Sequence, residues 1–272
     1  MTTVTSAPPG HREPELRGQT VVVIGGSSGI GLATATPARA GGADVILTGL
    51  HPNDALKRAA HDLAALSTAA FDANDPAELE RFFAGLPNAI DHVMVTAGGP
   101  QYGRLLETTF DELRHALSDH LLLAVEVARN AVDRVRPGGT LLFMSPEGGK
   151  PTVGSGAELT VAAAVPALIA NLALEPAPVR VNLIAAGFID TPLSASLLGR
   201  DLEQRRDQLR ATLPIGRVVE PADVAAHAVH IMSNTPDRVD LHHRRRTATR
   251  LGLADHVLNR FPRSVPAGPC GS

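Results

Sequence analysis

Aromatic residues are scarce in this chain of 272 residues. They make up 3% of the sequence, there is no tryptophan, and Tyr102 is the only tyrosine. Lysine is almost as rare, since Lys57 and Lys150 are the only two. A reaction that depends on a tyrosine and a lysine acting together must therefore use these few residues, or substitutes for them.

Cysteine and long apolar segments are also missing. The single cysteine, Cys270, excludes an intramolecular disulfide framework and metal clusters built on cysteine. No apolar run reaches the roughly 18 to 20 residues that span a bilayer. Residues 1–18 lack the apolar core of a secretory signal. We therefore expect a cytoplasmic protein without membrane partners.

The sequence does contain an alternation of short apolar strands with helices. Strands are predicted at residues 20–24, 44–48, 67–71, 92–96, 140–145 and 179–184, and helices at residues 32–40, 53–66, 76–84, 108–135, 157–174 and 221–232. The strands are continuous apolar runs, which is typical of strands buried on both faces. Strands that alternate with helices favour a parallel sheet. We predict a single-domain, doubly wound α/β sheet of the Rossmann type, with a ligand at the carboxyl ends of its strands.

The composition changes after residue 233. From Asn234 onward the chain holds seven basic and three acidic residues and no strand-like run, whereas the whole chain has a net charge of −3. We predict a disordered tail over residues 1–17, a folded domain over residues 18–233 and an atypical basic tail over residues 234–272. The three adjacent arginines of this tail lack interleaved aromatics, so we expect no nucleic-acid partner.

Four histidines in two pairs are candidate metal ligands. No third ligand stands at a clear spacing from the paired histidines, so we predict no metal site. These histidines are His227, His230, His242 and His243.

A glycine-rich turn joins the first predicted strand to the first predicted helix. Gly25, Gly29 and Gly31 follow the strand directly, an order typical of a pyrophosphate-binding turn. The glycines let the backbone approach a phosphate, and the helix N-terminus offers unpaired N–H groups and the positive end of its dipole. Ser27 and Ser28 add hydroxyl donors. The competing interpretation is a tight turn without a ligand.

This turn resembles the cofactor motif of the short-chain dehydrogenase/reductase family. Residues 95–98 stand where that family usually has Asn-Asn-Ala-Gly, and residues 182–191 resemble its nicotinamide-contacting segment. The resemblance covers residues 18–233 and implies an NAD(P)(H)-dependent oxidoreductase that interconverts a carbonyl and an alcohol. The cofactor contacts that it implies are Gly25, Ser27, Ser28, Gly29, Ile30, Gly31, Asp72, Ala97, Gly98, Gly187, Ile189 and Thr191.

The end of the second predicted strand bears on the choice of nicotinamide cofactor. A carboxylate there would bond the ribose 2′-OH and favour NAD(H), but residues 48–51 read Thr-Gly-Leu-His. We therefore favour NADP(H) over NAD(H), with His51, Lys57 and Arg58 as candidate partners of the 2′-phosphate. The alternative is that these three are solvated loop and helix residues.

The resemblance implies catalysis by a Tyr-x-x-x-Lys pair on the helix after the fifth strand, which this chain lacks. Counting back from the sixth strand places Glu158 at the tyrosine position and Ala162 at the lysine position. The serine position falls on Ser145, or on Pro146 if the loop shifts by one residue, and the asparagine position falls on His120. The candidate catalytic residues are therefore Ser145, His120 and Glu158.

Three functions remain open from the sequence. The first is an oxidoreductase with a non-standard proton donor, for which Tyr102 is a further candidate. Leu193, Leu197 and Leu198 lie in the expected lid at residues 191–214 and indicate an apolar small-molecule substrate, the alternative being that they are ordinary helix core. The second is a nucleotide-binding pseudoenzyme that senses cofactor or scaffolds a partner. The third is a poorly folded product without activity.

The basic tail has an explanation at the level of the gene. Members of this family normally end with a seventh strand and an Asp-Gly-Gly signature. One permitted back-translation of residues 237–251, read one base later, gives TGSTYTIDGGQQLV, which resembles that ending. We hypothesise that residues 237–272 are out of frame and that the last strand is lost, which would weaken a family-like homo-oligomer. The alternative is a genuine, divergent tail.

Overall fold

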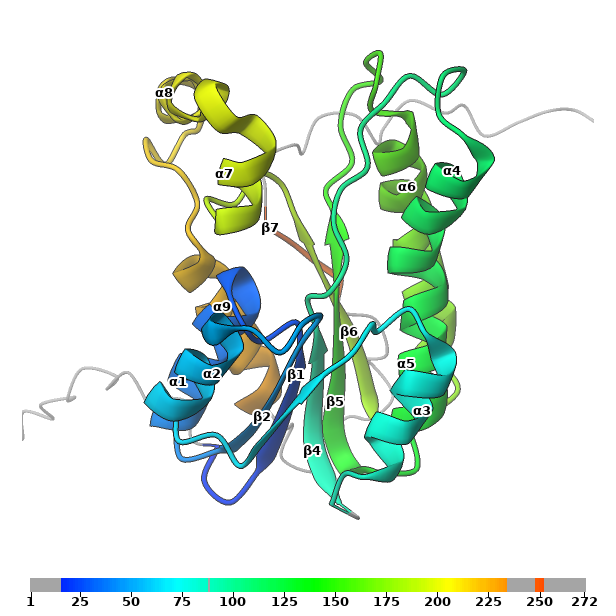
Figure 1. The fold of residues 1–272 in the computed structure, drawn as a ribbon, viewed down its shortest axis with the longest axis vertical. Helices are drawn as coiled ribbons and strands as arrows, with labels where there is room; N and C mark the ends of the chain where they lie inside the picture. The colour runs from blue at the N-terminus through cyan, green and yellow to red at the C-terminus, as the bar shows by residue number, and fades with distance from the viewer. Residues whose placement is uncertain (1–15, 88, 234–247, 252–272) are drawn as a thin grey trace, which may run out of the picture.

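The computed structural model of the chain describes residues 16–87, 89–233 and 248–251. These residues form one parallel sheet of seven strands in the order β3-β2-β1-β4-β5-β6-β7, with helices on both faces (Figure 1). This confirms the predicted doubly wound α/β fold. The order of strand addition reverses between β1 and β4, because β2 and β3 lie on one side of β1 and β4 to β7 lie on the other. Ligands of such folds bind beside this reversal point.

Five of the six predicted strands agree with the structure to within two residues at each end, whereas β5 begins five residues earlier than predicted and β7 is not predicted. The described strands are β1 (Thr20–Ile24), β2 (Asp44–Gly49), β3 (Ser67–Ala70), β4 (Ile90–Val95), β5 (Val135–Pro146), β6 (Arg180–Ala186) and β7 (Ala248–Leu251). The described helices are α1 (Gly29–Ala40), α2 (Asp54–Asp62), α3 (Pro76–Ala84), α4 (Phe110–Leu117), α5 (Leu123–Ala131), α6 (Gly156–Leu172), α7 (Pro192–Leu198), α8 (Leu202–Thr212) and α9 (Pro221–Ser233).

Two hydrophobic cores lie on opposite faces of the sheet. Successive strand residues point to opposite faces, so Val22 of β1 packs in the core beneath α3, α5 and α6. Its neighbour Val23 packs in the core beneath α1, α2 and α9. Both side chains are fully buried. The continuous apolar strands are therefore explained by burial on both faces (Figure 1).

The prediction that the last strand is lost is wrong. β7 pairs with β6 in parallel, with Ala248 opposite Leu183 and Leu251 opposite Ala186. The four residues of β7 include an arginine and make no apolar run, which is why the sequence pattern does not reveal them. The rest of the predicted basic tail lies outside the described residues.

The folded part of the chain begins earlier than the predicted boundary at residue 18. Leu16 is fully buried, and its N–H donates to the carbonyl of Gly41 at 2.9 Å. Residues 16 and 17 therefore belong to the folded domain, while residues 1–15 lie outside the described residues.

The long helix predicted over residues 108–135 is divided. It consists of α4, a π-helical turn at Ser118–Leu122, and α5, and β5 already begins at Val135. A capping box at Thr109 and Glu112 begins α4. Single π-helical turns inside α-helices are frequent at functional sites. In the part of the chain that the structure describes, no helix has the length and apolar character to cross a membrane.

Candidate active site

A cavity of about 1000 Å³ opens at the carboxyl ends of the strands. It lies between α7 and α8 on one side and the loop after β4 with α6 on the other (Figure 1). This is the edge at which doubly wound sheets bind their ligands.

The cavity brings together eleven of the twelve predicted cofactor contacts. Those that line it are Gly25, Ser27, Ser28, Gly29, Ile30, Asp72, Ala97, Gly98, Gly187, Ile189 and Thr191. Gly31 is buried behind them in α1. A Cβ atom at Gly31 would lie 2.7 Å from Oγ1 of Thr96 and closer still to the carbonyl oxygen of Gly25. Gly31 therefore does not line the cavity, and its role is to let α1 pack closely against the segments that contain Gly25 and Thr96.

The turn before α1 has the features of a phosphate cradle. Gly25 and Gly29 have φ values of +93° and +54°, which favour glycine. Ser28 is the N-cap of α1, but its side chain makes no capping bond, and the first turn holds no acidic residue. The first N–H groups of α1 and the positive end of its dipole therefore face the cavity without a side-chain partner, and they fit a pyrophosphate.

The end of β2 forms one wall of the cavity. Leu50 lines the cavity there and is 59% exposed. Within the described residues, the carboxylates that line the cavity come from other segments than β2. The three predicted phosphate partners, His51, Lys57 and Arg58, are not among the lining residues. Nζ of Lys57 lies 3.8 Å from a carboxylate oxygen of Asp54 on the exposed face of α2.

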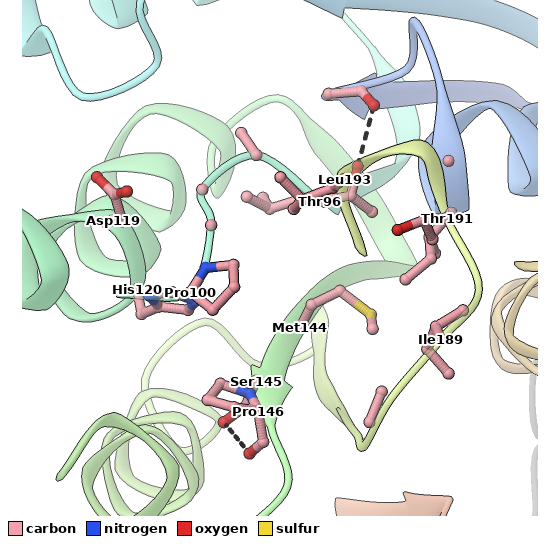
Figure 2. A pocket seen from close by; sticks show the side chains of 18 of the residues that line it. Thr96, Pro100, Asp119, His120, Met144, Ser145, Pro146, Ile189, Thr191 and Leu193 are labelled. Atoms are coloured by element: carbon pink, nitrogen blue, oxygen red, sulfur yellow. Dashed lines mark hydrogen bonds between the residues drawn. The ribbon is translucent and has the colours of Figure 1, made fainter. Parts of the chain in front are cut away.

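Ser145 lies at the end of β5, on the cavity wall (Figure 2). Its side chain is buried, and its hydroxyl donates to the carbonyl oxygen of Pro146 at 3.0 Å. A serine hydroxyl rotates freely, so the same group can turn to donate to a ligand oxygen. Pro146, the other candidate for this position, has no side-chain donor.

Glu158 stands in the first turn of α6 and is buried in the cavity wall. Its Oε1 accepts a hydrogen bond of 2.5 Å from the main-chain N–H of Gln101. Burial raises the pKa of Glu158, while the Gln101 bond and nearby His120 partly offset this effect. One turn further along α6, Ala162 is buried at the predicted lysine position.

His120 lies in the π-helical turn and lines the cavity (Figure 2). Its Nδ1 is 3.4 Å from the carbonyl oxygen of Ala116. Because His120 affects the pKa of Glu158, the structure brings these two predicted catalytic candidates into electrostatic range. Ser145 lines the same cavity, so all three candidates share one site.

Asp119, beside His120, is a lining residue that the sequence interpretation missed. Its Oδ1 accepts from the side-chain amide of Asn74 at 2.8 Å, and burial raises its pKa. Gly98 has a φ of +101°, and a Cβ there would lie 3.0 Å from the Asp119 carbonyl oxygen. The close approach of the two segments therefore depends on Gly98. No local sequence pattern distinguishes Asp119 from the helix residues around it.

Tyr102 and Lys150 also line the cavity. Neither lies on α6, where the family resemblance predicts the Tyr-x-x-x-Lys pair. Tyr102 lies on the loop after β4 and is 64% exposed. Partial burial and Glu158 raise the pKa of Tyr102, and Arg205 lowers it. Leu193, Leu197 and Leu198 of α7 line the same space, as predicted. Among the described residues, no cluster of three or more histidine, cysteine or acidic side chains could hold a metal ion.

The fold and the glycine-rich cradle define a dinucleotide-binding α/β protein. Residues 24–239 match the family model described as Enoyl-(Acyl carrier protein) reductase. The chain is 33% identical over 233 residues to an NADP-dependent (R)-specific alcohol dehydrogenase of Lentilactobacillus kefiri, covering 80% of this chain and 91% of that protein. The chain therefore belongs to the short-chain dehydrogenase/reductase family of oxidoreductases.

Solved structures agree with this assignment. The MalC reductase/Diels-Alderase of Malbranchea aurantiaca superposes with a TM-score of 0.73 at 26% identity, covering 83% of this chain and 94% of that one. BdcA in complex with NADPH superposes with a TM-score of 0.71 at 26% identity, covering 79% of this chain and 87% of that one.

Proposed function

We propose that this protein is an NADP(H)-dependent oxidoreductase that interconverts a carbonyl and an alcohol, with Glu158 as the proton donor. The observation that carries the proposal is the position of Glu158. It is buried in the wall of the cavity that the glycine-rich turn enters, and burial raises its pKa. A carboxyl group with a raised pKa stays protonated closer to neutral pH and can act as a general acid.

The cofactor would lie along the carboxyl ends of β1, β2 and β4. The first turn of α1, with Ser27 and Ser28, would bind its pyrophosphate, and Asp72 would contact the adenine. The nicotinamide would lie against Gly187 and Ile189. NADP(H) is favoured because a carboxylate that would repel a 2′-phosphate is missing from the β2 wall among the described residues. The alcohol dehydrogenase relative is NADP-dependent, and BdcA was solved with NADPH.

The chemistry of the proposed reaction needs a hydride and a proton. When bound, the nicotinamide supplies or accepts the hydride. Ser145 would hold the carbonyl oxygen through its rotated hydroxyl. Oε1 of Glu158 accepts the Gln101 N–H, so the proton of the neutral acid resides on Oε2. Glu158 would transfer this proton to the substrate oxygen as the alcohol forms, and His120 would return a proton to Glu158 from solvent.

The second candidate is a nucleotide-binding protein without redox turnover. It is favoured by Ala162, which is buried at the lysine position, because α6 then offers no cation to hold the nicotinamide ribose or to activate a proton donor. In that case the cavity would sense the cofactor or present it to a partner.

Binding measured apart from turnover tests the proposal. NADPH and NADH are titrated by fluorescence, and oxidation of NADPH is followed with a panel of carbonyl compounds. We expect tighter binding of NADPH and turnover with some members of the panel. Tight binding without oxidation across the panel would support the second candidate. Absence of nucleotide binding, together with a low melting temperature, would support a poorly folded product and exclude both.

A further inference from the structure

Three arginines of α8 differ in their partners. Arg206 makes a bidentate ion pair with Asp190, with two bonds of 2.8 Å, and also bonds Glu203. Arg210 bonds Asp207 at 2.7 Å. In the part of the chain that the structure describes, Arg205 has no carboxylate partner, although it lines the cavity.

Arg205 is nevertheless held in place. Its guanidinium lies over the ring of Phe188, 5.9 Å from the ring centre, and one of its N–H groups donates to Oε1 of Gln208 at 2.8 Å. The ion pair between Arg206 and Asp190 ties α8 to the segment after β6. The charge of Arg205 is therefore positioned before any ligand binds, which lowers the entropic cost of binding an anion.

The position of Arg205 is at the substrate end of the cavity. Its charge affects the pKa of Tyr102, which Glu158 also affects, so these three groups share one region. The phosphate cradle at the start of α1 is formed by other segments. In Figure 1, α8 stands across the cavity mouth from α6, which carries Glu158.

The remaining walls at this end favour an elongated apolar molecule. Leu193, Leu197 and Leu198 of α7 line the cavity, and in Figure 1 α7 lies between α8, which carries Arg205, and the carboxyl ends of the strands. Two carboxylates, Glu147 and Glu158, also line this region, together with Lys150. An anion would therefore bind at the α8 side, away from the carboxylates of the β5 and α6 side.

We propose that the substrate is a carbonyl compound that carries a carboxylate, which Arg205 binds, with its apolar chain against α7 and its carbonyl at Ser145 and Glu158. This inference rests on the proposed function, whose substrate class it names. A guanidinium recognises a carboxylate through two parallel charge-assisted hydrogen bonds. The negative charge of the substrate also favours the neutral form of Glu158, which is the form that donates a proton.

The test compares straight-chain keto acids with their methyl esters, in which a methyl group replaces the negative charge at one end. KM and kcat are measured for the wild type, Arg205→Met, Arg205→Lys and the control Arg210→Met, which removes an α8 arginine outside the cavity lining. We expect the wild type to prefer the acids and Arg205→Met to raise their KM about 10- to 100-fold, in line with the loss of a charge-assisted bond. The esters, Arg210→Met and the dissociation constant of NADPH should be unchanged, and Arg205→Lys should recover part of the preference.

A binding measurement separates this inference from the proposed function. The same keto acids and esters are titrated by calorimetry into protein saturated with NADP⁺, where no turnover is required. Preferential binding of acids that Arg205→Met removes would support the inference even if no reduction is found. Equal binding of acids and esters, binding of neither, or a loss of NADPH affinity in Arg205→Met would overturn it.

Discussion

The main-chain N–H of Gln101 donates a 2.5 Å hydrogen bond to Oε1 of Glu158 and so ties the loop after β4 to the first turn of α6. A second bond, from the N–H of Gly103 to the carbonyl of Gly154 at 2.9 Å, joins the same two segments. Tyr102 lies between these two attachment points. Glu158, which the sequence predicts at the family's catalytic tyrosine position, therefore also fixes the loop that bears the only tyrosine of the chain.

Glu158→Gln should abolish most of the carbonyl reduction. The amide keeps an oxygen that accepts the Gln101 N–H, but it has no acidic proton to transfer. We expect kcat to fall about 10²- to 10⁴-fold, the usual contribution of a general acid, with the dissociation constant of NADPH unchanged. Steady-state kinetics and fluorescence titration measure the two quantities.

The matched control for this variant is Glu80→Gln, which makes the same change at an exposed position of α3 outside the cavity lining. It should leave kcat and NADPH binding unaltered. If Glu158→Gln retains full activity while Tyr102→Phe loses it, the proton donor is Tyr102 and our assignment is wrong.

The pH profile of the reduction should report the raised pKa of Glu158. Only the protonated carboxyl donates a proton, so kcat for reduction should fall as the pH rises through this pKa. Because burial raises the pKa above its ordinary value of 4.5, the fall should lie above pH 4.5. Alcohol oxidation needs the carboxylate and should rise over the same range. A profile that stays the same in Glu158→Gln would contradict the assignment.

Gly31→Ala should weaken both the fold and cofactor binding. The added methyl group would meet Oγ1 of Thr96 and the carbonyl of Gly25, so α1 or the glycine-rich turn must move. Overpacking of this kind costs about 1 to 3 kcal/mol. We expect a lower melting temperature and a weaker NADPH affinity. Gly148→Ala is the control, since a Cβ there meets no atom within 4 Å. Wild-type binding by Gly31→Ala would show that tight packing at this position is dispensable.

The parts of the fold that the sequence predicts are those with local signals. The apolar run at Thr20–Ile24 is bounded by glycines, and the strand has the predicted bounds. Asp75 with Pro76 predicts the start of α3, and the Asp75 side chain does accept from the N–H groups of Ala77 and Glu78. β7 escapes prediction because its four residues make no apolar run and its strand conformation depends on pairing with β6, which is a tertiary contact.

The candidate site divides in the same way. The glycine-rich turn can be identified from the sequence because the residues that form it are consecutive. The hydrogen bond between Asn74 and Asp119 joins residues 45 positions apart, and no local sequence pattern predicts it. Arg205 looks like its neighbour Arg206 in the sequence. Only the packing of α8 shows that Arg206 is bonded to Asp190 while Arg205 faces the cavity.

His92 should make the protein less stable in acid. Burial, and to a lesser extent Arg180, lowers the pKa of His92 from 6.5 to about 4, whereas Asp91 acts in the opposite direction. Between pH 6.5 and about 4, His92 is protonated in the unfolded chain but remains neutral in the folded chain. The free energy of unfolding therefore decreases as the pH falls through this range. The full effect of this one group corresponds to about 3 kcal/mol.

Denaturant unfolding at a series of pH values measures this effect. His92→Gln keeps a group that can bond Oε1 of Gln19, which His92 contacts through Nε2 at 2.6 Å, but it removes the titration. Its unfolding free energy should change less between pH 6.5 and 4 than that of the wild type. The exposed His61→Gln is the control and should retain the wild-type slope. Equal slopes in all three proteins would exclude His92 as the source.

The gene should contain a frame change near the codon of Asn234. Helix α9 extends the described fold to Ser233. The reading shifted by one base places the β-branched and aromatic sequence STYTI at positions 239–243, which favours an edge strand beside β6. Sequencing the gene across this codon and comparing it with related genes should show an insertion or deletion. A protein made from the corrected gene should then melt at a higher temperature, because STYTI has a higher β-propensity than the Ala-Thr-Arg-Leu sequence of β7 that pairs with β6 in the present chain. An intact frame with no insertion or deletion relative to close relatives would establish the basic tail as genuine and overturn the hypothesis. Because Glu158 and Ala162 lie upstream of the change, the corrected protein should show the same dependence on Glu158.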